Sequence, residues 1–170
     1  MDSGRRIVVM GVAGSGKSTL GQLLAQNLAC PFVEGDDEHP PANILKMRAG
    51  SALDDADRLP WLLRLQARIA AARHDQTSLV VSCSALKYAY RDLLRAGDPG
   101  LFFLHLHGNA ILLQNRLAAR EGHFMPASLL LSQLHDLEPL GEGENGMCLN
   151  FADTPEQLLR QIFPAPPGEI

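Results

Sequence analysis

The stretch Gly11–Ser18 has the spacing G-x-x-x-x-G-K-S, which is typical of a phosphate-binding loop. The residues before it, Ile7–Met10, are apolar and mostly β-branched, as expected of a buried strand. After it, leucines recur at helical spacing, at positions 20, 23, 24 and 28. The loop thus lies between a strand and a helix, and this context favours a nucleoside triphosphate site.

Each part of the loop has a role in holding phosphates. The glycines let the backbone curl so that its N–H groups reach phosphate oxygens, and the helix adds its own N-terminal N–H groups. Lys17 supplies a positive charge for the β- and γ-phosphates, and the Ser18 hydroxyl is a candidate Mg²⁺ ligand. The predicted phosphate-binding residues are Gly11, Val12, Ala13, Gly14, Ser15, Gly16, Lys17, Ser18 and Thr19.

Composition limits the class of protein. A chain of 170 residues that is 46% hydrophobic and 20% charged is expected to form one globular domain over residues 1–170. A formal net charge of −4 disfavours a nucleic-acid partner, and no apolar run is long enough for a membrane span. The N-terminus lacks a secretory signal, and the three cysteines lack zinc-site or disulfide spacing. A cytoplasmic setting is therefore expected.

Strand and helix patterns alternate along the chain. Buried-strand patterns at 32–33, 78–83, 101–106 and 147–151 follow the first strand. Helices are expected at 16–28, 42–49, after an acidic turn at 53–58 with Pro60 in the first helical turn, at 85–95, from Asn109, at 127–137 and from Thr154. This alternation predicts an α/β fold with a parallel sheet and helices on both faces. The tail at 164–170 is expected to be loose.

Acidic side chains follow the second predicted strand. Ligands of parallel sheets bind at the carboxyl ends of the strands. A hydroxyl that accepts a phosphoryl group needs a carboxylate to orient it and take its proton, and Asp36 is the predicted base. Glu34 is a candidate for the Mg²⁺ shell, directly or through water. The alternative is an acidic turn that caps the next helix.

His39 lies near the same edge and is a candidate contact to a polyhydroxy ligand, although a lone histidine is more often a surface or capping residue. Arg58 is a cation in the first turn of a helix, where a cation is unfavourable, so it is a candidate for an anionic substrate group. Lys87 and Arg91 follow the third strand and are predicted to share a helical face toward the substrate.

Arg116 and Arg120 are spaced i, i+4 before a glycine-containing break. Two arginines on one face beside such a break predict a lid, at about 116–137, that brings positive charge onto the phosphates. The alternative is a pair of solvated surface arginines.

Several blocks together resemble the gluconate kinases (gluconokinases) of the thermoresistant type. The matching blocks cover nearly the whole chain in order: G-V-A-G-S-G-K-S at Gly11, G-D-x-x-H-P at Gly35, N-I-x-K-M at Asn43, L-x-D-x-D-R-x-P-W-L at Leu53, C-S-A-L-K-x-x-Y-R-D-L-L-R at Cys83, R-L-x-x-R-x-G-H-F at Arg116 and L-E-P at Leu137. Two positions depart from the family, with Ala52 where proline is common and Glu34 where aspartate is common.

The resemblance implies a P-loop NTPase fold similar to shikimate and nucleoside-monophosphate kinases, with a five-stranded parallel sheet in the order 2-3-1-4-5. It implies phosphorylation of D-gluconate at its 6-hydroxyl by ATP and Mg²⁺, which gives 6-phospho-D-gluconate for the pentose phosphate pathway. Asp36 and Lys17 would be catalytic. Family members are often homodimers. The alternatives are a nucleoside-monophosphate or shikimate kinase, and a nucleotide-dependent switch without turnover.

Overall fold

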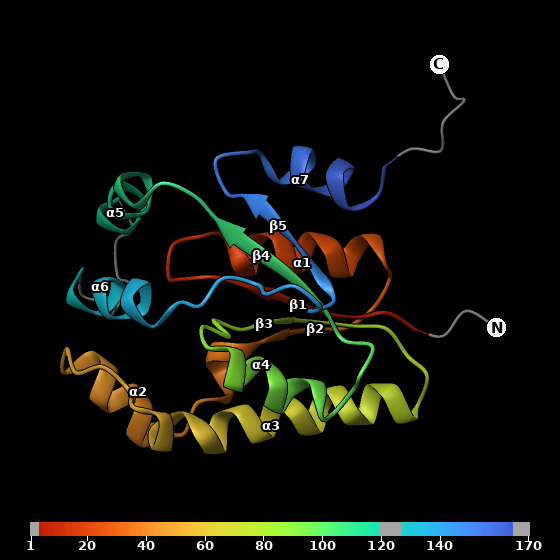
Figure 1. Ribbon diagram of the computed structural model, residues 1–170, viewed down its shortest axis with the longest axis horizontal. Coiled ribbons are helices and arrows are strands. Elements are labelled where there is room, and N and C mark those ends of the chain that lie inside the picture. Colours follow the sequence, from red (N-terminus) through yellow and green to blue (C-terminus); the bar gives the residue numbers. More distant parts are fainter. Residues whose placement is uncertain (1–3, 120–126, 165–170) are drawn as a thin grey trace.

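The computed structural model of the protein describes residues 4–119 and 127–164 (Figure 1). The strands are β1 (Arg6–Met10), β2 (Phe32–Glu34), β3 (Leu79–Ser82), β4 (Phe102–His107) and β5 (Gly146–Asn150). The helices are α1 (Lys17–Asn27), α2 (Pro41–Arg48), α3 (Asp55–His74), α4 (Tyr88–Arg95), α5 (Ala110–Ala118), α6 (Ala127–Asp136) and α7 (Pro155–Ile162), and a 3₁₀ turn, η1, spans Gly35–Glu38.

The five strands are parallel and lie in the order β2-β3-β1-β4-β5, which confirms the predicted topology. Helices α3 and α4 cover one face of the sheet, and α1 and α7 cover the other (Figure 1). The carboxyl ends of the strands point toward the side on which α2, α5 and α6 lie (Figure 1). Residues that directly follow β1, β2 and β3 therefore meet at one edge of the sheet.

The central strand β1 is buried on both faces. Val8 and Met10 pack in the cluster that contains Trp61 of α3, whereas Ile7 and Val9 pack in the cluster around α1. Alternate residues of a strand point to opposite faces, so a strand between two helical layers must be apolar throughout. This is the physical reason for the uninterrupted apolar run that precedes the phosphate-binding loop.

Helix α3 begins earlier than Pro60 suggested. The side chain of Asp54 accepts a hydrogen bond from the Asp57 N–H, and the Asp57 carboxylate accepts one from the Asp54 N–H. This capping box starts the helix at Asp55. The expectation that Pro60 lies in the first turn was wrong, and the proline is tolerated in the helix at an exposed position.

Helix α4 begins later than predicted. Residues 85–87 are not helical, because the carbonyl of Leu86 accepts a hydrogen bond from the Glu138 N–H (2.8 Å) and Ala85 adopts a left-handed backbone with φ 43°. Lys87 is the residue before the helix, so the prediction that Lys87 and Arg91 share a helical face was wrong.

The predicted lid comprises the end of α5, residues 120–126 and α6. Residues 120–126, Arg120 among them, lie outside the described residues, as does the tail from residue 165.

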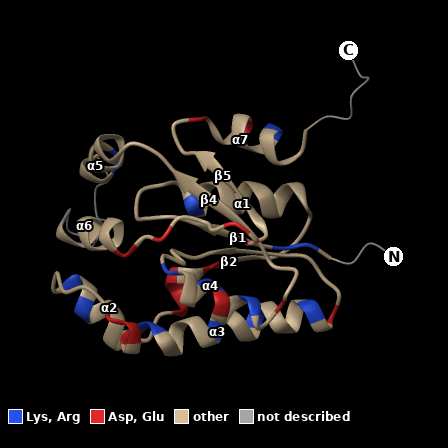
Figure 2. Cartoon of the chain, in the orientation of Figure 1, with Lys and Arg blue, Asp and Glu red and all other residues tan. Residues whose placement is uncertain are grey.

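Acidic and basic residues both occur along α3 (Figure 2). Within residues 4–119 and 127–164, every helix is too short or too polar to cross a membrane.

Candidate active site

The phosphate-binding loop joins β1 to α1 as predicted. Gly14 and Gly16 have φ values of +79° and +94°, a left-handed conformation in which a side chain would be strained. Gly16 is the N-cap of α1 and has no side chain to cap the helix, so the N–H groups of the first turn are not occupied by a side-chain cap. The Lys17 Nζ donates to the Val12 carbonyl (3.0 Å), which holds the ammonium against the loop. The loop has the features of an anion site at a helix N-terminus.

A pocket lies beside this loop, at the carboxyl ends of β1, β2 and β3. We call it the main pocket. Its lining residues are Ala13, Gly14, Gly16, Lys17, Ser18, Asp36, His39, Met47, Ala52, Leu53, Arg58, Trp61, Ser84, Leu129, Ser132 and Gln133. The structure therefore brings Asp36, His39 and Arg58 to one pocket with Lys17 and Ser18.

Asp36 reaches the pocket from η1. The preceding Gly35 is anchored at both ends, because its N–H donates to the Ser82 hydroxyl (3.1 Å) and its carbonyl accepts from the Trp61 indole (2.6 Å). The Asp36 carboxylate forms no hydrogen bond or ion pair with residues 4–119 or 127–164 and is exposed to the pocket. It is therefore available to a ligand.

We expect Gly35→Ala to misplace Asp36. A Cβ on Gly35 would lie 2.0 Å from the Ser82 carbonyl oxygen, which belongs to β3 and cannot move aside. Such overpacking costs about 1–3 kcal/mol of unfolding free energy. Urea unfolding should show this loss, together with a lower kcat. Gly141→Ala is the control, because its Cβ would meet only the Glu144 carboxylate, at an ordinary 3.7 Å. Equal stability of the two variants would contradict the expected clash.

Glu34 does not line the main pocket. Strand β2 ends at this residue, so Glu34 and Asp36 do not alternate along one strand as they would if the strand continued. The Glu34 carboxylate instead accepts a hydrogen bond from the Ser82 hydroxyl. In the described part of the chain, no group of three or more His, Cys, Asp or Glu side chains is arranged to hold a metal ion.

His39 is buried and tightly positioned. Its ring stacks on Trp61, with the ring centroids 4.1 Å apart and the planes 15° apart, and its Nδ1 lies 3.2 Å from the Asn43 Nδ2. Burial lowers the pKa of His39 to about 4, with Asp36 opposing this and Arg58 adding to it. The ring is therefore neutral at pH 7.

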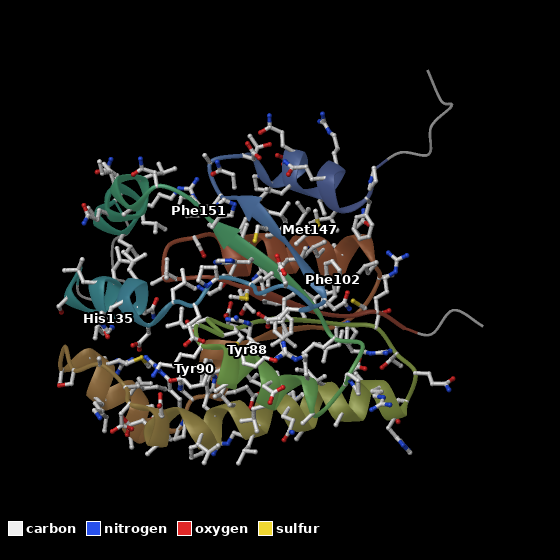
Figure 3. All side chains as sticks on the ribbon, in the orientation of Figure 1. Tyr88, Tyr90, Phe102, His135, Met147 and Phe151 are labelled. Atoms are coloured by element: carbon white, nitrogen blue, oxygen red, sulfur yellow. The ribbon has the colours of Figure 1, made fainter. Side chains whose placement is uncertain are left out.

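Arg58 lines the pocket with a guanidinium held from two sides. Its Nη1 donates to the Tyr90 hydroxyl (2.8 Å) and to the Asp136 carboxylate (3.0 Å). Tyr90 also donates to Asp55, at the start of α3, and extends from α4 (Figure 3). Sequence reasoning missed Tyr90 and Asp136, because they lie 32 and 78 residues from Arg58 and no local spacing links them.

Lys87 and Arg91 do not line the main pocket. Lys87 pairs with Asp55 (2.8 Å). Arg91 is fully buried, and its guanidinium is held by the Glu144 carboxylate and by backbone carbonyls. The prediction that Arg91 contacts the substrate is contradicted, because a buried ion pair already uses the charge.

Arg116 lies on a second pocket, on the other side of the loop. This pocket is lined by Gly14, Ser15, Gly16, Thr19, Leu20, Arg116, Ala119, Phe151, Asp153, Pro155 and Leu158. The Arg116 guanidinium donates to the Phe151 carbonyl (2.7 Å) and lies 5.3 Å from the centre of its ring. Figure 3 shows Phe151 between α5 and the sheet.

The sequence also gave no indication that Gln133 contacts the phosphate-binding loop. This residue of α6 accepts a hydrogen bond from the Ala13 N–H (2.7 Å), so the predicted lid region touches the phosphate-binding loop directly. A glutamine within an apolar helical pattern carries no signal of such a contact.

Known proteins are similar to this chain in architecture and in sequence. The family model described as shikimate kinase matches residues 13–128. A gluconokinase from Gluconobacter oxydans is 44% identical over 94% of this chain and 89% of its own. The thermoresistant gluconokinase of Escherichia coli is 44% identical over 87% and 85%. The crystal structure of a gluconokinase from Sinorhizobium meliloti is 47% identical, with a TM-score of 0.83 over 94% of this chain and 89% of that one.

These relatives are 44–47% identical to this chain and cover 87–94% of it. The matched family model begins within the phosphate-binding loop and ends in α6, so it covers the predicted site residues except Gly11 and Val12. The chain is a P-loop kinase and belongs to the gluconokinase family.

Proposed function

We propose that this enzyme transfers the γ-phosphoryl group of ATP to the 6-hydroxyl of D-gluconate and so produces 6-phospho-D-gluconate. The observation that carries the proposal is the main pocket, in which Lys17 and Ser18 of the loop face the carboxylate of Asp36 and the donors of His39 and Arg58. A sugar acid offers the groups that such a pocket recognises, namely hydroxyls and one carboxylate. The relatives named gluconokinase support this choice of acceptor.

Each residue has a part in the transfer. The loop N–H groups and Lys17 hold the phosphates and balance the charge that develops on the transferred group. Asp36 orients the 6-hydroxyl for in-line attack and takes its proton. Arg58 pairs with the gluconate carboxylate, and His39 donates to an oxygen of the sugar chain. Arg58 is ready for this role, because Tyr90 and Asp136 fix its guanidinium at the pocket wall.

Mg²⁺, when bound with ATP, would neutralise part of the charge of the phosphates. Ser18 lies in the main pocket at the start of α1, and its hydroxyl fits the role of a ligand there. Glu34 would act only through water, since its carboxylate is bound to Ser82.

The second pocket fits the nucleoside of ATP. It shares Gly14 and Gly16 with the main pocket, so a nucleotide whose phosphates lie on the loop can extend into it. Phe151 offers an aromatic ring, and Arg116 offers a cation next to the loop. In this proposal Arg116 acts from the nucleotide side, and Arg120 from the lid.

We expect Arg116→Ala to weaken ATP binding. Loss of a hydrogen bond to a charged group costs about 1.5–3 kcal/mol, which corresponds to about a 10- to 100-fold higher KM for ATP. The KM for gluconate should stay within about twofold, because Arg116 does not line the main pocket. Steady-state kinetics with each substrate varied measure both values, and Arg160→Ala on α7 is an exposed control. An unchanged KM for ATP would remove Arg116 from the nucleotide site.

A coupled assay that compares acceptors tests the proposal directly. ADP release should depend on gluconate and be absent with shikimate or nucleoside monophosphates. Shikimate is included because the matched family model carries that name. Failure to phosphorylate gluconate would overturn the assignment, and slow hydrolysis insensitive to every acceptor would indicate a nucleotide switch instead.

We further propose that the enzyme works in the cytoplasm as a homodimer on a small-molecule substrate, without a nucleic-acid or membrane partner. The acidic net charge of −4 and the three free cysteines support this setting. Light scattering after size-exclusion chromatography tests the dimer. A mass of one chain, 18.5 kDa, would refute it.

A further inference from the structure

The surroundings of His39 define which of its two ring nitrogens carries the proton. The Asn43 side chain lies between His39 and the backbone of α3, and both residues are buried. The same amide nitrogen, Nδ2, lies 2.8 Å from the Asp57 carbonyl oxygen and 3.2 Å from the His39 Nδ1. A carbonyl oxygen only accepts hydrogen bonds, so the atom that faces it must be the NH₂ group.

This assignment decides the tautomer. An amide NH₂ carries two hydrogens and accepts none, so it donates one to the Asp57 carbonyl and the other to His39. The His39 Nδ1 must therefore be the unprotonated acceptor, and the proton of the neutral ring lies on Nε2. Within the described residues, Nε2 has no protein partner, although the ring lines the main pocket.

The plane of the ring is fixed as well. Trp61 stacks on His39, and the Trp61 indole is itself anchored to the Gly35 carbonyl. Stacking alone allows two orientations of the ring, related by a half-turn about the Cβ–Cγ bond, and the hydrogen bond from Asn43 selects the one in which Nδ1 faces Asn43. Together the two contacts aim one neutral N–H donor, next to the cation of Arg58 and the anion of Asp36.

We propose that Asn43 is a positioning residue, which locks His39 as the Nε2–H tautomer so that the ring donates a hydrogen bond to a hydroxyl oxygen of the acceptor substrate. This proposal deepens the proposed function and depends on it for the identity of the acceptor. A neutral donor suits a hydroxyl, while Arg58 supplies the charge for a carboxylate. Asn43 itself does not line the pocket.

The tautomer is measured by ¹⁵N NMR of the histidine side chains in the wild-type enzyme at pH 7, with His39→Gln used to assign the signal. We expect a pyridine-type shift at Nδ1 and a pyrrole-type shift at Nε2. A pyrrole-type shift at Nδ1 would overturn the proposal. This measurement needs no turnover, so it stays decisive even if gluconate proves not to be the substrate, which the acceptor assay would show separately.

Two variants test the effect on binding. Asn43→Asp and Asn43→Leu both remove the donor to the Asp57 carbonyl, but only Asn43→Asp presents an acceptor that draws the proton to Nδ1. We expect Asn43→Asp to raise the KM for gluconate about three- to tenfold, the scale of one neutral hydrogen bond, and Asn43→Leu to raise it less. The KM for ATP should stay unchanged in both. Equal effects of the two variants would show that Asn43 only supports the fold.

A double variant separates the tautomer from other causes. Gln at position 39 carries an N–H donor whichever group occupies position 43. In the His39→Gln background, Asn43→Asp should therefore change the KM for gluconate by less than about twofold. The same three- to tenfold rise in this background would contradict the proposal, because the effect would then not pass through the histidine.

Discussion

Asp36→Asn is expected to lower kcat by about two orders of magnitude or more, the scale of a positioned general base. Asparagine has the same shape as aspartate, but it cannot take the proton of the 6-hydroxyl. The Asp36 side chain forms no hydrogen bond or ion pair with residues 4–119 or 127–164, so its replacement leaves the described fold intact. A coupled assay measures kcat, and calorimetry with a non-hydrolysable ATP analogue should give a Kd close to that of the wild type.

The neighbouring Asp37 supplies a matched control. It is an exposed carboxylate in the same turn, η1, and it does not line the main pocket. Asp37→Asn makes the same change in net charge and should keep nearly full turnover. Near-normal kcat for Asp36→Asn would remove Asp36 from the role of base, and equal losses in the two variants would point to a general electrostatic effect instead.

The parts of this protein that sequence predicts well are those with local causes. The β-branched run before Gly11, the loop spacing and the helical leucines lie within a few turns of one another, and the structure has the strand, loop and helix in the predicted places. The capping residues Asn109 and Thr154 likewise act within their own first turn, and α5 and α7 begin where these residues indicate. The strand order was taken from family resemblance, which carries information beyond local pattern.

The acceptor side was harder to predict, because tertiary contacts decide it. Whether Glu34 or Asp36 faces the pocket depends on where β2 ends, and Gly35 is drawn against Ser82, which is 47 residues away. The Glu34 carboxylate, which looks equivalent to that of Asp36 in the sequence, is therefore bound to Ser82 outside the pocket. Asn43 belongs to one of the sequence blocks that resemble the gluconokinases. Its contacts to His39 and to the Asp57 carbonyl exist only in the folded chain, so the sequence did not predict them.

Arg91 shows how a reasonable chemical prediction fails. A cation after the third strand of a kinase suggests a contact to an anionic substrate, and nothing near it in sequence argues otherwise. In the fold, its Nε and Nη2 donate to the two oxygens of Glu144, both at 2.8 Å. The remaining donors reach the carbonyls of Ala85, Leu86, Glu138 and Pro139. The arginine therefore joins α4 to the segment between α6 and β5.

We expect Arg91→Met to lower the free energy of unfolding by about 3–5 kcal/mol, the cost of breaking a buried ion pair from one side. The Arg91 side chain is 0% exposed and that of Glu144 is 2% exposed, so Glu144 would remain buried with Arg95 as its remaining cation. Urea unfolding measures the loss. The folded variant should keep its KM for gluconate, because Arg91 does not line the main pocket.

Two further variants sharpen this prediction. Arg95→Met removes the other cation that pairs with Glu144. The Arg95 side chain is 17% exposed, so its loss should lower the free energy of unfolding by less than Arg91→Met does. Replacing the whole pair, as in Arg91→Met with Glu144→Leu, should recover part of the loss, since no uncompensated charge remains buried. A raised KM for gluconate with unchanged stability in Arg91→Met would instead restore Arg91 as a substrate contact.

The ion pair between Arg91 and Glu144 also predicts how the stability of the fold depends on pH. Burial alone would raise the pKa of Glu144, but hydrogen bonds from Arg91, the Gly141 N–H and Arg95 lower it to about 2. A carboxyl whose pKa is lower in the folded state stabilises the fold above its ordinary pKa, and this stabilisation is lost as the pH falls. The free energy of unfolding of the wild type should therefore decrease between about pH 4.5 and pH 2.

In Arg91→Met the folded-state pKa of Glu144 moves back toward its ordinary value, so the decrease over this range should be shallower. Parallel curves for the two proteins would show that Arg91 does not set the charge state of Glu144.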